Sequence, residues 1–234
     1  MQMHRRFRIA VLALGVLFMG ATHAAEPAGK PSLAGIWFPD PTRSERLGKD
    51  APYTKEGKAI VDRFRATHDP TKDDPGLFCI PAGMPSLALG GADYPVEILE
   101  TQSQTTILME LHQQVRRIFL NKKHPEDLFP QRNGHSVGRW EGQVFVVDTI
   151  GIRPASFGAV PHSDQVHVTE RWQRIDDGKS LVNELTIRDP KMYSKPVVLR
   201  QYYKAAGADA RMMEYECTEG RWVEYEKSRG ITPD

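Results

Sequence analysis

The chain has 234 residues, with 31 basic and 30 acidic side chains and a formal net charge of +1. This balance gives no electrostatic basis for binding nucleic acid. The sequence has no Gly-rich phosphate loop and no alternation of strands and helices, so it offers no support for a nucleotide cofactor.

Residues 1–24 have the pattern of a secretory signal peptide. Three arginines precede the apolar run IAVLALGVLFMG, and the small residues Thr22 and Ala24 favour cleavage after Ala24. The apolar run is too short to span a bilayer comfortably, and no second run follows. We therefore expect a periplasmic or secreted protein without a membrane span, with residues 25–234 as its single domain.

The two cysteines, Cys79 and Cys217, lie too far apart in the sequence for a CxxC redox motif or a thiolate metal site. In an oxidising compartment such a pair favours a structural disulfide. This disulfide would connect the segment after the first helix to the last strand.

The N-terminal part of the mature chain predicts few regular elements. Residues 25–52 are rich in Pro, Gly and Lys and predict an extended lead-in, interrupted by LAGIWFPD. Residues 53–69 predict the one helix, with Thr54 as its N-cap. The helix has an apolar stripe formed by Ile60, Val61 and Phe64. A loop with many Pro and Gly residues follows up to Pro95.

From Val96 onward the apolar residues recur with a period of two. Short segments of this kind, separated by turn residues, continue to Cys217 and predict an antiparallel sheet. We expect a mainly β fold: an antiparallel β-barrel or strongly curled sheet, lipocalin- or calycin-like, of about eight to ten strands with one N-terminal helix. The last of these strands would be residues 211–217.

The hairpin GHSVGRWEGQVFVVDT, residues 134–149, carries the first candidate site. A two-residue turn at Glu141 and Gly142 would place His135 directly opposite Asp148 on one face. An aspartate that binds one imidazole nitrogen fixes the tautomer and raises the basicity of the ring, which makes His135 a candidate general base. The alternative is a purely structural pair of polar groups at the mouth of a barrel.

The next hairpin turns through DDGK, residues 176–179. This turn pairs Ile175 with Ser180 and puts an ion pair of Arg171 with Glu184 on the solvated face. The opposite face places Glu170 among apolar side chains, where ionisation without a partner is costly. Glu170 is therefore either an acid with a raised pKa or one half of an internal salt bridge, for example with Arg139 or Arg117.

Further polar residues lie on the predicted loops. His162 and His167 bracket SDQV and join the candidate catalytic set: His135, Asp148, Glu170, His167 and His162. Candidates for substrate binding are His124, Arg139, Tyr193 and Asp189. We expect no cofactor. A divalent metal held by His135, His162, His167 and a carboxylate is the alternative, but the chain has no HExxH or HxH spacing to support it. GHSVG is not a nucleophile elbow.

Several motifs together resemble one family. FCIPAGMP, HQQVRRIFLN, HPEDL, GHSVGRWEGQVFVVDTIG, PHSDQVHVTERWQRID and LTIRDPKMYSKP are similar to a large uncharacterised family of secreted proteobacterial and acidobacterial hypothetical proteins with a G-H-S-[IV]-G-R-W-E-G motif. The resemblance covers almost all of residues 25–234 and directs attention to His124, His135, Asp148, His162, Ser163, His167, Glu170, Arg171, Asp189 and Tyr193. Where relatives more often have an acidic residue after the Gly of the turn, this chain has Gln143. Residues 35–37, GIW, are also similar to the G-x-W that opens lipocalin barrels.

Three functions follow as expectations. The first is an enzyme that uses cofactor-free acid–base chemistry, a lyase, isomerase or hydrolase acting on a small organic molecule, with the candidate catalytic residues lining one cavity. The second is a lipocalin-like protein that binds an apolar small molecule without catalysis, inside a mainly aliphatic and aromatic barrel. The third is an envelope interaction protein, which would have an exposed apolar patch and no cavity.

Overall fold

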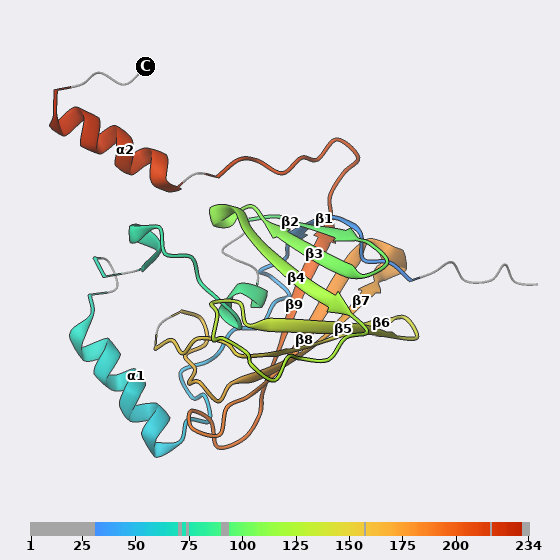
Figure 1. The fold of residues 1–234 in the computed structure, drawn as a ribbon, viewed down its shortest axis with the longest axis horizontal. Coiled ribbons are helices and arrows are strands. Elements are labelled where there is room, and N and C mark those ends of the chain that lie inside the picture. Colours follow the sequence, from blue (N-terminus) through green and yellow to red (C-terminus); the bar gives the residue numbers. More distant parts are fainter. Residues whose placement is uncertain are drawn as a thin grey trace, which may run out of the picture. The chain divides into compact units, whose positions relative to one another are not determined.

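The computed structural model describes residues 31–69, 72–73, 75–89, 94–156, 158–215 and 217–230. The predicted signal peptide and the start of the lead-in lie outside these residues. The described residues contain nine strands (Figure 1): β1 (Gly35–Pro39), β2 (Val96–Glu100), β3 (Gln104–Met109), β4 (Gln114–Leu120), β5 (His135–Glu141), β6 (Val144–Ile150), β7 (His167–Ile175), β8 (Ser180–Arg188) and β9 (Val197–Ala205).

The nine strands form a closed barrel in sequence order. Each strand pairs with the next, and β9 pairs with β1, so that Trp37 lies opposite Ala205. All pairs are antiparallel except β4 with β5, which run parallel. The connection between these two strands, residues 121–134, is called the crossover segment below. The predicted mainly β barrel of about eight to ten strands is therefore confirmed.

The predicted N-terminal helix is confirmed as α1 (Lys55–Thr67). Thr54 is its N-cap, and the Thr54 side chain accepts a hydrogen bond from the Gly57 amide while its hydroxyl donates to the Lys191 carbonyl. Gly57 packs so closely on the backbone of Met192 that a Cβ atom at this position would lie 2.3 Å from the Met192 oxygen. The helix is thereby fixed against the loop between β8 and β9.

The predicted last strand, residues 211–217, is wrong. Residues 211–215 form no strand, and a second helix, α2 (Cys217–Ser228), begins at Cys217. The physical reason lies in the barrel closure: β9 already pairs with both β8 and β1, so no sheet edge is left to pair with a tenth strand. The predicted disulfide between Cys79 and Cys217 is confirmed, but it connects the segment after α1 to a helix. None of the described helices is long and apolar enough to cross a membrane.

The two predicted hairpins have different outcomes. The register of β7 with β8 is confirmed, with Ile175 opposite Ser180. The turn between β5 and β6 lies one residue later than predicted, because Glu141 pairs with Val144 and the turn consists of Gly142 and Gln143. Each β5 residue therefore pairs with a β6 residue two positions beyond the predicted partner. Gly142 has φ of 61°, which suits the first central position of a type II′ turn. The expected type I′ turn, with this glycine in the second position, is therefore wrong.

Candidate functional site

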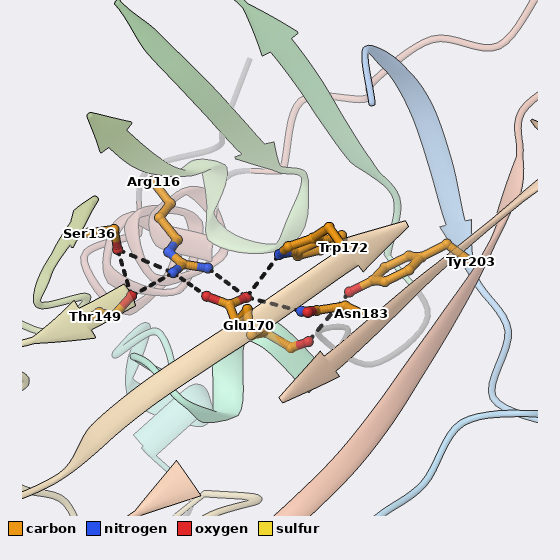
Figure 2. A network of polar contacts seen from close by, with 8 residues as sticks. Arg116, Ser136, Thr149, Glu170, Trp172, Asn183 and Tyr203 are labelled. Atoms are coloured by element: carbon orange, nitrogen blue, oxygen red, sulfur yellow. Dashed lines mark hydrogen bonds and ion pairs between the residues drawn. The ribbon is translucent and has the colours of Figure 1, made fainter. Parts of the chain in front are cut away.

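The barrel interior holds a buried ion pair. Arg116 on β4 donates from Nη1 to Oε1 of Glu170 on β7 at 3.0 Å, and its Nη2 is in short contact with Oε2. Figure 2 shows how side chains of neighbouring strands surround the pair. Arg116 Nη2 also donates to Ser136 and Thr149, and Glu170 Oε1 accepts from Trp172 Nε1 at 3.2 Å and from Asn183 Nδ2 at 2.9 Å.

This pair decides between the two alternatives predicted for Glu170. The internal salt bridge is the observed one, but its partner is Arg116 rather than Arg139 or Arg117. Along β4 the side chains alternate, so Arg116 points into the barrel and Arg117 is exposed. Arg139 is exposed and pairs with Glu141 instead, with 2.5 Å between Nη2 and Oε1, so it does not contribute to an interior site.

Large side chains fill the rest of the barrel interior. Trp37, Phe145, Trp172 and Tyr203 are buried and belong to one apolar cluster together with aliphatic side chains from the other strands. Burial, and secondarily the nearby Glu170 carboxylate, raises the pKa of the Tyr203 hydroxyl. The strands therefore enclose a packed core with one neutralised ion pair.

A second cluster of ionisable groups lies on the outer face of the barrel. It consists of His124 from the crossover segment, His135 at the start of β5, Asp148 on β6 and His167 at the start of β7, and we call it the histidine–aspartate array. His124 Nδ1 lies 2.8 Å from His135 Nδ1, and His124 Nε2 lies 2.9 Å from Asp148 Oδ1. His167 Nε2 lies 2.5 Å from Asp148 Oδ2.

The array shifts the pKa values of its members in opposite directions. A hydrogen bond from His167 is the largest cause that lowers the pKa of Asp148, and the contact with His124 lowers it further. The same hydrogen bond to Asp148 raises the pKa of His167. Burial, followed by the nearby His124, lowers the pKa of His135. In the array, the protonated form of His167 and the neutral form of His135 are therefore favoured.

The expected direct pair of His135 with Asp148 is wrong. In the observed register His135 faces Ile150, and Asp148 faces Val137. His135 and Asp148 do belong to one network, but His124 lies between them. The expected cavity-facing orientation is also wrong, because the interior face of this hairpin carries Ser136 and Thr149. The array is half-exposed on the opposite face.

His162 is separate from the array. Its Nδ1 lies 2.9 Å from the Val160 carbonyl and its Nε2 lies 3.0 Å from the Arg153 carbonyl. Backbone hydrogen bonds also join His162 to Ala155 in both directions. The ring is buried, and its contacts with two carbonyls stabilise the loop between β6 and β7. The predicted grouping of His162 with His135, Asp148 and His167 is not observed.

Asp189 and Tyr193 also have structural contacts. The Asp189 carboxylate accepts from the amide and hydroxyl of Ser163 and from the amides of Lys191 and Met192. The Tyr193 hydroxyl donates to the Pro161 carbonyl at 2.7 Å, and burial raises its pKa. Both residues connect the β6–β7 loop to the β8–β9 loop, and neither lies in the array.

A cavity of about 290 Å³ lies among the loops, and we call it the end cavity. It is lined by residues 80–84 and Ser86, by Arg132 at the end of the crossover segment, and by residues 153–155, Gly158 and His162. Its apolar walls come from Ile80, Pro81, Met84, Pro154 and Ala155. Arg132, Arg153 and His162 also line it, and no carboxylate is among its described lining residues. Arg132 Nη1 donates to the Pro81 carbonyl at 2.6 Å, which places one guanidinium at the wall.

The described residues contain no group of three or more His, Cys, Asp and Glu side chains arranged to hold a metal ion. The alternative metal site named above would need His162 beside His135 and His167. His162 instead binds loop carbonyls through both ring nitrogens.

No protein-family model and no curated protein matches the chain. Among solved structures, the chain is similar to the REP1-NXSQ fatty acid transporter, with a TM-score of 0.40 and 12% identity over 76% of this chain and 98% of the other. It is also similar to a fatty acid-binding protein from brain tissue of Drosophila melanogaster, with a TM-score of 0.37 and 16% identity over 74% of this chain and 100% of the other.

The sequence analysis did not single out three arginines, of which Arg116 forms the interior ion pair and Arg132 and Arg153 line the end cavity. Arg116 could have been recognised, because two consecutive arginines in a strand of period two must point to opposite faces. Arg132 and Arg153 carry no such signal. They lie in irregular segments, and only the folded loops bring them to the same cavity.

Proposed function

We propose that the protein binds a small organic molecule with an apolar body and an anionic group, and that the end cavity is its binding site. The observation that carries this proposal is the cavity lining: apolar walls with two arginines and no described carboxylate. Ligand sites of proteins combine apolar walls with a few polar groups that fix orientation, and the volume of about 290 Å³ is near the lower end of their range.

The charge of the end cavity supports an anionic ligand. Neither Arg132 nor Arg153 has an ion-pair partner among the described residues. An arginine presents several N–H donors in a fixed plane and binds a carboxylate or phosphate through two parallel hydrogen bonds. Arg116, in contrast, is neutralised by Glu170 and is not available to a ligand.

The packed barrel interior supports a ligand site among the loops rather than between the strands. A ligand inside the barrel would have to displace large side chains such as Trp172 and Tyr203, which are almost completely buried. The end cavity requires no such displacement. It also favours a binding protein over the envelope interaction protein, for which we expected no cavity.

The proposed location is the periplasm or the extracellular space. Two observations support it: the signal-like pattern of residues 1–24 and the disulfide between Cys79 and Cys217. A ligand of this protein would then be met outside the cytoplasm.

The probe for testing the proposal is 2-naphthoate, with the neutral 2-naphthamide as its matched control. We expect isothermal titration to show saturable binding of 2-naphthoate and weaker binding of the amide. Replacing Arg153 by Met should weaken binding of the naphthoate by roughly tenfold or more, because it removes a charge-assisted hydrogen bond. Ala155→Trp should abolish binding by filling the cavity.

Arg63→Met is the matched charge control, because Arg63 is exposed on α1 and does not line the end cavity. It should bind 2-naphthoate as the unmodified protein does. Binding that is equal for naphthoate and naphthamide would show that the guanidinium groups select no charge. Binding that survives Ala155→Trp would place the ligand elsewhere. Either result would overturn the proposal.

A further inference from the structure

The contacts of the histidine–aspartate array define the positions of its protons. An ionised Asp148 carboxylate has no hydrogen to donate, so both His124 Nε2 and His167 Nε2 donate to it. When His124 is neutral, its Nδ1 has a lone pair, and the neighbouring His135 Nδ1 carries the hydrogen that lies between the two rings. This order leaves His135 Nε2 without a proton.

Two ring nitrogens of the array are free to contact a ligand. Neither His135 Nε2 nor His167 Nδ1 has a hydrogen-bond partner among the described residues. The first has a lone pair, and the second carries a hydrogen when His167 is protonated. A proton acceptor, His135 Nε2, and a proton donor, His167 Nδ1, therefore belong to the same hydrogen-bonded network.

The barrel places these two histidines on the two strands that neighbour β6. His135 lies opposite Ile150, and the pairing of β6 with β7 continues from Thr149 with Val168 toward Ile150 with His167. The two histidines therefore lie on either side of β6, about 10 Å apart between Cα atoms, which is two inter-strand spacings. Both rings point to the outer face, so a small molecule lying over β6 could meet both.

The surroundings hold the base in place. The ring of Phe119 on β4 stacks on the His135 ring, with 5.2 Å between centroids, and His124 holds its Nδ1 side. Such fixing of one tautomer by a hydrogen bond to the other nitrogen is how proteins prepare a histidine for general base catalysis. Asp148 acts on His135 through His124, so both are positioning residues.

We propose that the histidine–aspartate array is a proton-transfer site that hydrolyses small, activated carboxylic esters on the outer face of β5, β6 and β7. His135 Nε2 takes a proton from a water molecule, and the water oxygen forms a bond to the acyl carbon. Protonated His167 donates its Nδ1–H to the carbonyl oxygen as that oxygen becomes negative. The carbon–oxygen bond to the leaving group then breaks, and the leaving group receives the proton from His135. The products are a carboxylic acid and an alcohol.

The protonation states required by this reaction coexist near neutral pH. The site needs neutral His135 and protonated His167, and their pKa values are shifted in these two directions. The other groups that act on them are His124 of the crossover segment, Asp148 on β6 and Arg188 on β8, which lowers the pKa of His167. We expect a bell-shaped pH profile of the rate, with its maximum around pH 6.5, the ordinary pKa of histidine.

The test measures release of 4-nitrophenolate from 4-nitrophenyl acetate between pH 5 and 9. The protein should exceed the rate of an equal concentration of free imidazole, and His135→Gln should lower that rate about 100-fold or more. His167→Gln should lower it less and remove the alkaline limb of the profile. Asp148→Asn should move both limbs. The control His68→Gln, at the exposed end of α1, should leave rate and profile unchanged.

A second measurement does not depend on activity or on the folding of a variant. The ¹⁵N chemical shifts of the unmodified protein at pH 7 should show His135 with its hydrogen on Nδ1 and not on Nε2. A hydrogen on Nε2 would overturn the proposal. So would a rate no higher than that of imidazole, or a folded His135→Gln variant that keeps the original rate.

Discussion

Arg116 and Glu170 form an ion pair in the middle of the barrel, with side-chain exposures of 1% and 0%. Neither charge can be left alone there, because an unpaired buried charge costs several kcal/mol. The surrounding donors complete the site: Trp172 and Asn183 also donate to Glu170. The pair therefore specifies how β4 and β7 face each other across the interior.

Removing one partner should destabilise the protein strongly. We expect Glu170→Gln to lower the free energy of unfolding by about 3–5 kcal/mol, because Arg116 would stay buried without a counter-charge. The double variant Arg116→Met with Glu170→Gln should be more stable than Glu170→Gln alone. Urea denaturation of the two single variants and the double variant measures this as a double-mutant cycle. Additive effects would contradict the account.

The second prediction concerns the pH dependence of stability. The pKa of Asp148 is lowered, so its contribution is present above the unfolded value of about 3.9 and is lost as the pH falls through the folded value. The pKa of His167 is raised, so its contribution is complete below the unfolded value of about 6.5 and is lost as the pH rises through the folded value.

Both contributions therefore coexist between about pH 4 and 6.5. The stability difference between the unmodified protein and Asp148→Asn should be largest in this window, as measured by urea unfolding at a series of pH values. Asp50→Asn, at an exposed position, is the control and should change the stability little. A difference for Asp148→Asn that is constant from pH 4 to 8 would contradict the linkage.

Two helical glycines predict opposite effects of the same substitution. Alanine has a higher helix propensity than glycine, by about 1 kcal/mol. At Gly220 in α2 a Cβ atom would meet nothing within 4 Å, so Gly220→Ala should be neutral or slightly stabilising. At Gly57 in α1 it would lie 2.3 Å from the Met192 oxygen, so Gly57→Ala should lower the melting temperature. Thermal unfolding followed by circular dichroism compares the two; equal shifts would refute the close packing of α1.

The disulfide should stabilise the folded chain. Cys79 and Cys217 are separated by 138 residues, and closing a long loop restricts the unfolded ensemble. We expect the double variant Cys79→Ser with Cys217→Ser to lose about 2–4 kcal/mol of unfolding free energy while the strand signal in circular dichroism is kept. A reducing agent should bring the unmodified protein to the same value and leave the variant unchanged. Loss of the strand signal would mean that the barrel depends on the disulfide.

Local patterns in the sequence were sufficient for several elements. The N-cap Thr54 and the register of β7 with β8 follow from residues close together in the chain, and both predictions are confirmed. The inward orientation of Glu170 followed from the alternation along β7. Local chemistry misled at the first hairpin: Glu141-Gly142 resembles a type I′ turn, but the glycine occupies the first turn position.

The array and the end cavity could not be predicted, because both depend on long-range geometry. His124 reaches Asp148 only because β4 and β5 are parallel, which sends the crossover segment along the outside of the barrel. A run of antiparallel-looking strands contains no sign of one parallel pair. The end cavity likewise joins residues 80–84 to residues 153–155, and no periodicity links these segments.

The pairing of Trp37 with Ala205 has a consequence for how the molecule folds. The barrel is closed by strands from opposite ends of the sheet order, so β1 cannot find its second partner until β9 has been made. A growing chain that lacks β9 has two open sheet edges, on β1 and β8, and open edges invite pairing with other chains. Closure between distant segments also slows folding. We therefore expect the nascent protein to pass through a stage in which protection from aggregation matters more than the stability of the finished barrel.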